Sequence, residues 1–147
     1  MKNKLFFGSI ISLIFGIAIY LLFRTSSLKV FGWLEILNID FLNSDIRKFS
    51  IKYLEILPNW FLYSLPDGLW IFSYVCLMIY IWNFKLKAHS FFWIGTIPLI
   101  AIFSEIGQAI NLIPGTFDFC DLLFYILGFS IPILLTFNNK HSKLLKL

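Results

Sequence analysis

Apolar residues dominate four stretches of this chain, and each stretch is about as long as a membrane-spanning helix. The stretches cover residues 5–23, 66–84, 91–112 and 119–137. A bilayer with a hydrocarbon core about 30 Å thick requires about 20 predominantly apolar residues of a helix that crosses it. The pattern therefore predicts an all-α integral membrane protein, built as a four-helix transmembrane bundle.

Small residues recur along the first predicted span at every fourth position. They are Gly8, Ser12 and Gly16. Such spacing places them on one face of a helix, where they let a second helix backbone approach closely. We expect this face to pack on another helix, either in the same chain or in a second copy.

The segment between the first two spans, residues 24–65, is too apolar for a solvated loop. Within residues 44–57, apolar side chains follow helical spacing at Ile46, Phe49, Tyr53 and Ile56, and most of the charged residues fall elsewhere. This pattern predicts an amphipathic helix lying in the outer membrane interface. It would either cap the bundle or act as a lid over an outward-facing pocket.

Composition supports the membrane class and excludes several others. Of the 147 residues, 59% are hydrophobic and only 14% are charged, whereas soluble domains are about 25% charged. We treat residues 1–147 as a single domain. Cys76 and Cys120 lie at different predicted depths, so a disulfide is not expected, and no Cys/His cluster indicates a zinc or redox site.

The basic residues indicate how the chain crosses the membrane. They precede the first span, separate the second from the third and follow the fourth: Lys2, Lys4, Lys85, Lys87, Lys140, Lys143 and Lys146, together with His89 and His141. Positive loops favour the cytoplasmic side, so we predict a multi-pass protein with both termini in the cytoplasm. The net charge of +4 reflects this topology, and we expect no nucleic-acid partner.

One face of the third span is polar. Ser104, Glu105, Gln108 and Asn111 share a stripe of a 3.6-residue helix, and apolar residues cover the rest. An ionised carboxylate costs about 3 kcal/mol or more in the hydrocarbon, so such residues normally face a protein interior or a water-filled cavity. Glu105 is therefore the first candidate for a functional site.

The fourth span begins with a second polar stripe. Asp118, Asp121, Tyr125 and Gly128 share one helix face, and Asp67 opens the second span on the same predicted side of the membrane. Carboxylates that converge in this way repel one another, which raises a pKa or requires a cation, a metal or an arginine. Arg24, at the end of the first span, is the best-placed counter-ion.

This convergence gives a candidate site with more than one interpretation. The predicted ligand-binding residues are Glu105, Gln108, Asp118, Asp121, Asp67, Tyr125 and Arg24. A divalent cation could be held by Glu105, Asp118 and Asp121. Alternatively, the three aspartates cap helices, with Ser64-x-x-Asp67 as a capping box, and Glu105 and Gln108 form an interhelical hydrogen-bond clamp, for instance to Tyr125.

The motifs in these stripes resemble those of the VanZ-like membrane proteins. Glu105-x-x-Gln108 is followed by an aspartate and then by Asp121 and Gly128, as in the E-x-x-Q and D-x-x-x-N-x-x-G signature of that family. The asparagine position is Tyr125, and no loop arginine lies between Gln108 and Asp121. The D-x-L-W and F-x-x-x-D-L-x-x-Y-x-x-G motifs resemble a related uncharacterised branch more closely. The resemblance covers about residues 60–130 and implies a small, envelope-associated protein of the bacterial inner membrane.

Three functions are compatible with these features. The first is binding or modification of a lipid-linked or polar headgroup in an outward-facing acidic pocket, with membrane lipids or an envelope component as partners. The second is an accessory subunit or homo-oligomer whose buried polar residues join helices. The third is an intramembrane hydrolase or transferase with Glu105 as general acid or base and a divalent cation as cofactor. The sequence offers no convincing nucleophile for it.

Overall fold

The computed structural model describes residues 2–85 and 87–144, and side chains are described as far as Phe137. All regular structure in these ranges is helical, as the apolar pattern predicts. The helices are α1 (Lys2–Phe23), α2 (Lys29–Ile36), α3 (Asp45–Ile51), α4 (Asn59–Leu62), α5 (Ser64–Ile81), α6 (Ala88–Ala109) and α7 (Phe119–Leu144). Lys146, which entered the topology prediction, lies outside the described residues.

Four of these helices are long and apolar enough to cross a membrane. The qualifying segments are Asn3–Phe23, Ser64–Ile81, Ala88–Ala109 and Phe119–Phe137. They correspond to the four predicted spans, with ends that differ by a few residues. The four-helix architecture expected from the sequence is therefore confirmed.

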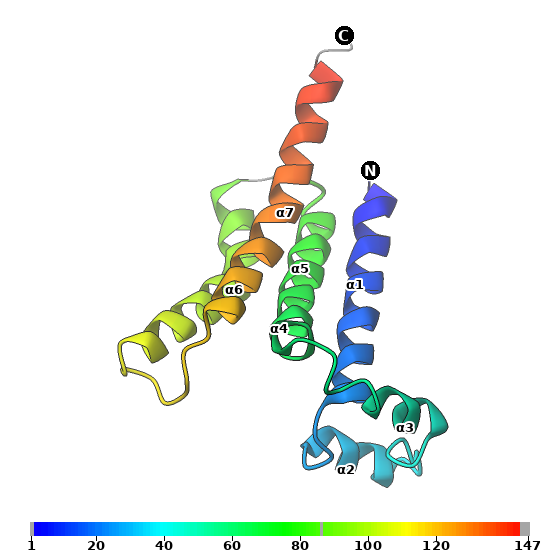
Figure 1. Cartoon of the computed structure of the whole chain (residues 1–147). Coiled ribbons are helices and arrows are strands. Elements are labelled where there is room, and N and C mark those ends of the chain that lie inside the picture. Colours follow the sequence, from blue (N-terminus) through cyan, green and yellow to red (C-terminus); the bar gives the residue numbers. More distant parts are fainter. Residues whose placement is uncertain (1, 86, 145–147) are drawn as a thin grey trace.

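Helix α5 occupies the middle of the bundle. It packs mainly against α1 on one side and α7 on the other, and α6 contacts both α5 and α7. The start of α1 and the end of α7 lie at one end of the bundle, while α2, α3 and the α6–α7 connection lie at the opposite end (Figure 1). The connections between the four long helices therefore alternate between the two ends of the bundle, as the predicted four crossings require.

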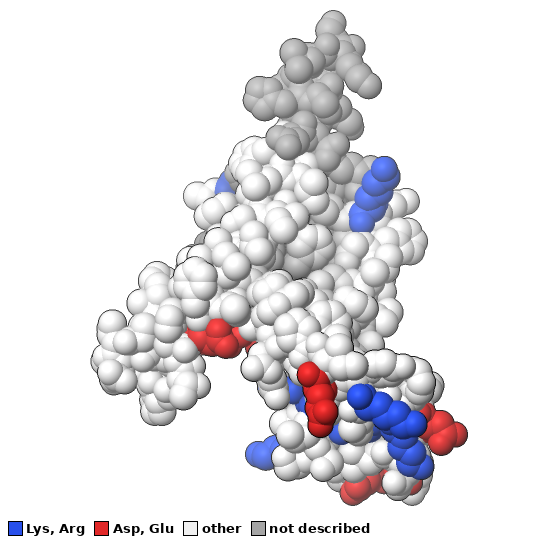
Figure 2. Space-filling view, viewed as in Figure 1, with Lys and Arg blue, Asp and Glu red and all other residues white. Residues whose placement is uncertain are grey.

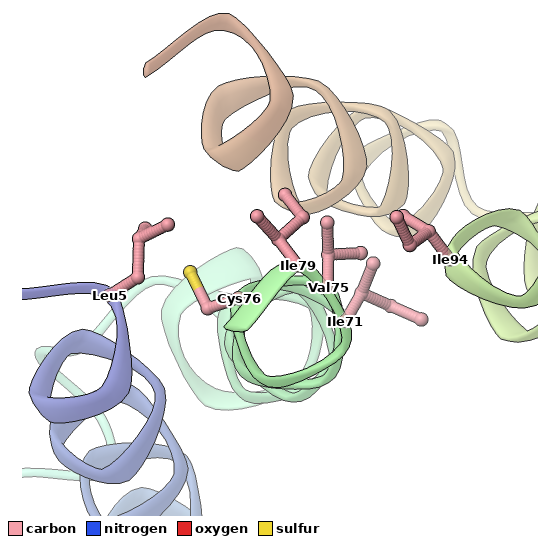
Figure 3. Close-up of a cluster of buried hydrophobic side chains, with 6 residues drawn as sticks. All are labelled: Leu5, Ile71, Val75, Cys76, Ile79 and Ile94. Carbon is pink, nitrogen blue, oxygen red and sulfur yellow. The ribbon is translucent and has the colours of Figure 1, made fainter. Parts of the chain in front are cut away.

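A buried cluster surrounds α5. It contains Leu5 from α1, Ile94 from α6 and Ile71, Val75, Cys76 and Ile79 from α5. In Figure 3, Cys76 points toward the α1 side, whereas Ile71, Val75 and Ile79 point toward α7 and α6. The central helix therefore buries two faces, which fits its uniformly apolar sequence.

The small residues of α1 pack within this chain. Ser73 of α5 donates a hydrogen bond to the Ser9 carbonyl at 2.8 Å, and Ser12 is buried. A Cβ added at Gly16 would lie 2.7 Å from Nε1 of Trp70. These contacts confirm that the stripe packs on another helix, and they identify that helix as α5, although Gly8 at its start has nothing within 4 Å.

Three short helices, α2, α3 and α4, lie in the segment between α1 and α5, and turns and irregular stretches connect them. The predicted helix over residues 44–57 is shorter than expected, because α3 ends at Ile51 and turns follow. Ile46, Phe49 and Ile56 are exposed, as expected for an interfacial apolar face. Arg47, which we expected on a polar face, is instead only 4% exposed.

Helix α5 begins without the predicted capping box. Its N-cap is Tyr63, which makes no side-chain capping bond, and Ser64 is the first helical residue. The Ser64 hydroxyl is buried without a hydrogen-bond partner among the described residues. The capping-box interpretation of Ser64 and Asp67 is therefore wrong. Asp67 interacts with Tyr125 of α7 instead.

Candidate acidic site between α5, α6 and α7

Glu105 faces the interior of the bundle. Its side chain is 6% exposed, and its Oε2 accepts a hydrogen bond from the backbone N–H of Asp118 at 3.3 Å. The apolar neighbours Phe103 and Ile106 are exposed on the opposite side of α6. The inward orientation expected from the cost of a carboxylate in hydrocarbon is thus observed.

Asp118 caps the last helix. Its Oδ1 accepts a hydrogen bond from the Cys120 backbone N–H at 2.7 Å, one residue inside the start of α7. A carboxylate at this position satisfies an otherwise unpaired N–H group and lies near the positive end of the helix. Asp118 therefore has the structural role that we weighed for it, and through its own N–H it also links Glu105 to α7.

Asp67, Tyr125 and Asp121 connect α5 with α7. The Tyr125 hydroxyl donates a hydrogen bond to the Asp67 carboxylate. Asp67 also interacts electrostatically with Asp121 and Glu105, and Glu105 with Asp121 and Asp118. We call Asp67, Glu105, Asp118 and Asp121 the acidic cluster.

One oxygen of the acidic cluster has no partner. Oδ1 of Asp121 is buried and makes no hydrogen bond with the described residues. A buried polar atom without a hydrogen bond is costly, so this oxygen is the member of the cluster that would gain most from a donor brought by a ligand.

Arg24 lies at the edge of the acidic cluster. Its guanidinium stacks over the rings of Tyr20, at 5.3 Å, and Tyr63, at 4.7 Å. It also interacts attractively with Asp67. Arg24 is therefore held by aromatic rings, and its positive charge acts on Asp67. Its assignment as the counter-ion of the acidic cluster stays a prediction.

Gln108 packs on the α6–α7 connection. Its side-chain amide lies against Gly115, whose φ is +143°, and a Cβ added there would lie 2.7 Å from Cδ of Gln108. Only glycine adopts this backbone conformation readily and leaves room for the amide. The predicted clamp from Glu105 and Gln108 to Tyr125 is not formed, because Tyr125 bonds Asp67 instead.

The bend of α6 opens the space in front of the acidic cluster. Pro98 lies inside this helix, where it removes a backbone hydrogen bond and favours a kink. The half of α6 after this point leans away from α5 and α7 (Figure 1). Figure 2 shows acidic atoms in the resulting hollow, between the end of α6 and the rest of the bundle.

The chemistry available here is electrostatic. Among the described side chains, no group of three or more His, Cys, Asp or Glu residues is arranged to hold a metal ion, so the cation site predicted at Glu105, Asp118 and Asp121 is not formed. Four carboxylates and a single nearby arginine leave an excess of negative charge. This arrangement can attract a cationic group and accept hydrogen bonds from it.

Comparison of the chain with protein-family models, curated proteins and solved structures gives no match.

The hydrogen bond between Tyr125 and Asp67 gives a direct test of the geometry. We expect Tyr125→Phe to lower the free energy of unfolding by about 0.5–2 kcal/mol, the usual range for a side-chain hydrogen bond between membrane helices. Thermal unfolding in detergent of Tyr125→Phe, Asp67→Asn and the double variant would measure the coupling. Tyr53→Phe, at an exposed position, is the control, and additive effects of the two changes would contradict the contact.

Proposed function

We propose that the acidic cluster binds the ammonium-bearing headgroup of a membrane lipid or of a lipid-linked envelope component. The observation that carries this proposal is the convergence of carboxylates from α5, α6 and α7, with Glu105 buried among them and acidic atoms visible in the hollow beside α6 (Figure 2). Like charges brought together in this way favour the binding of a positive partner. An ammonium group supplies both the charge and three hydrogen-bond donors.

The distribution of charge favours a zwitterionic headgroup. Asp121 offers a buried oxygen without a hydrogen-bond partner among the described residues, so it would accept an N–H from the ammonium. The charge of Arg24 acts on Asp67, and its guanidinium could pair with a phosphate attached to the same headgroup. Phosphatidylethanolamine has this combination of an ammonium group and a phosphate a short distance apart.

The proposed location is the outer side of the bacterial inner membrane. Positively charged loops favour the cytoplasm, which would place the termini inside and the acidic cluster outside. In that orientation, α2 and α3 would rest in the outer interface with their exposed apolar side chains in the lipid. We further propose that the chain is a VanZ-like, envelope-associated protein, on the strength of the motifs around Glu105, Gln108, Asp121 and Gly128.

Substitution of Glu105 by glutamine tests the proposed binding. Glutamine keeps an oxygen that can accept the Asp118 N–H, but it removes the charge. We expect the fold to persist and the affinity for phosphatidylethanolamine to fall about tenfold or more, because a hydrogen bond to a charged group contributes about 1.5–3 kcal/mol. Native mass spectrometry of the purified protein, titrated with this lipid in detergent, measures the loss.

Two comparisons make this experiment decisive. Asp121→Asn should weaken phosphatidylethanolamine in the same way, and Asp45→Asn, on the exposed surface of α3, should leave its binding unchanged. Wild-type protein should prefer phosphatidylethanolamine to phosphatidylcholine, whose quaternary ammonium cannot donate hydrogen bonds. Equal binding of the two lipids, or unchanged binding by both site variants, would overturn the proposal.

The bond from Asp118 to Glu105 favours a second candidate, an assembly role in which buried polar residues hold helices together. Comparison of Glu105→Ala with Glu105→Gln distinguishes the assembly role from the binding role, because alanine removes the hydrogen-bond acceptor as well as the charge. If the acceptor matters only for structure, Glu105→Ala loses folded yield while Glu105→Gln behaves as wild type in every assay. A Glu105→Gln protein that folds but does not bind the headgroup supports the binding site.

A further inference from the structure

An apolar groove lies at the end of the bundle opposite the acidic cluster. It has a volume of about 640 Å³ and runs along the first half of α6, beside Phe137 of α7. Apolar side chains form most of its walls, with Lys87 at one end: Phe91, Phe92, Thr96, Leu99, Phe137 and Lys87. The volume is in the range of about 300–1,000 Å³ that is typical of ligand sites.

The length of the groove matches one leaflet of a bilayer. Lys87 immediately precedes α6, and Leu99 lies twelve residues further along that helix. At 1.5 Å per residue this distance is about 18 Å, slightly more than half of a hydrocarbon core of about 30 Å. An acyl chain lying along Phe91 and Leu99 would therefore start at the membrane surface and end near the midplane.

The open end of the groove is positively charged. Lys87 is exposed there, and the N-terminus of α6 contributes the positive end of a 22-residue helix. The lining contains no acidic residue. Basic pockets between membrane helices attract lipids with anionic headgroups, at about 1 kcal/mol for each Lys or Arg near the surface.

We propose that this groove binds an anionic phospholipid of the leaflet on the side of the termini. One acyl chain lies between α6 and α7, and the phosphate pairs with the Lys87 ammonium at the start of α6. The occupant is a lipid rather than a protein helix. The apolar part of the groove lies along membrane-spanning segments, and the Lys87 ammonium at its end can pair with a headgroup. The acidic cluster, at the other end of these helices, takes no part in this binding.

Native mass spectrometry with phosphatidylglycerol and phosphatidylcholine tests the proposal. Wild-type protein in detergent should bind phosphatidylglycerol more tightly than phosphatidylcholine. Lys87→Gln should weaken phosphatidylglycerol about fivefold and leave phosphatidylcholine unchanged. Lys85→Gln is the matched control, because Lys85 lies two residues away in the same connection and does not line the groove.

Filling the groove provides an independent variant. Leu99 is exposed, so Leu99→Trp should fold normally, occupy the groove and weaken both lipids. Thermal unfolding of each variant confirms that the fold is retained. Equal affinity of wild-type protein for the two lipids, equal effects of Lys87→Gln and Lys85→Gln, or unchanged binding by Leu99→Trp would each overturn the proposal.

Discussion

Replacement of Gly128 by leucine is expected to prevent the chain from folding into a stable bundle. At this position α7 packs directly against the backbone of α5. A Cβ added to Gly128 would lie 2.4 Å from the carbonyl oxygen of Gly68 and 3.1 Å from the backbone nitrogen of Phe72. Both obstacles are backbone atoms of a buried helix, so a change of side-chain rotamer cannot relieve the clash.

The expected magnitude follows from the opposing contributions. Alanine is favoured over glycine by about 1 kcal/mol inside a helix, whereas overpacking costs about 1–3 kcal/mol even where neighbours can adjust. Gly128→Ala should therefore destabilise the protein despite the gain in helix propensity. Gly128→Leu should force α5 and α7 apart, which also separates Asp67 from Tyr125.

A glycine in open space provides the control for this prediction. Gly8 lies in α1, and a Cβ added to it has nothing within 4 Å. Gly8→Leu should give the yield and the thermal midpoint of wild-type protein, measured after size-exclusion chromatography in detergent. If Gly128→Leu matches Gly8→Leu in both measurements, the close crossing of α5 and α7 is wrong.

The spans could be predicted because each depends on the length and the periodicity of one segment. The inward orientation of Glu105 was predictable for a similar reason, since the cost of a carboxylate in lipid does not depend on which helix covers it. The short helices were harder to predict. Helix α3 ends at Ile51 although apolar residues continue to Ile56 at helical spacing. A helix of only two turns depends on its tertiary contacts for stability, and its own sequence pattern therefore does not determine where it ends.

The partners within the site could not be predicted from sequence. The stripes on α6 and α7 predicted that Tyr125 lies near several hydrogen-bond acceptors. Which acceptor Tyr125 reaches depends on the rotation of each helix about its own axis. That rotation is fixed by Gly68 and Gly128, which bring one side of α5 against α7 and turn Asp67 toward Tyr125. The packing of Gln108 on the connection likewise depends on the positive φ of Gly115, a backbone property that no helical pattern contains.

Replacement of Arg47 by alanine is expected to have the second large effect. The Arg47 guanidinium donates hydrogen bonds to the carbonyl oxygens of Leu21 and, at 2.6 Å, of Arg24, and it stacks on the Phe31 ring at 4.6 Å. Carbonyl groups at the end of a helix have no partner within that helix. Arg47 therefore caps the C-terminal end of α1 and attaches α2 and α3 to it.

Loss of this side chain leaves two part-buried carbonyl acceptors unpaired. Each such group costs about 1–3 kcal/mol, so Arg47→Ala should lower the free energy of unfolding by about 2–5 kcal/mol. Burial lowers the pKa of the Arg47 guanidinium from its ordinary value, but an arginine in a protein stays protonated. The effect should accordingly be the same at all pH values near neutrality.

The exposed neighbour Lys48 separates this specific cap from a general effect of charge. Lys48→Ala removes one positive charge from the same helix without touching α1 and should leave the thermal midpoint unchanged. Arg47→Lys should recover only part of the stability, since an ammonium lacks the rigid fork that reaches two carbonyl groups at once. Limited proteolysis should cut residues 24–58 faster in Arg47→Ala than in Lys48→Ala. Equal cutting would mean that α3 is held by its apolar face in the lipid rather than by the arginine.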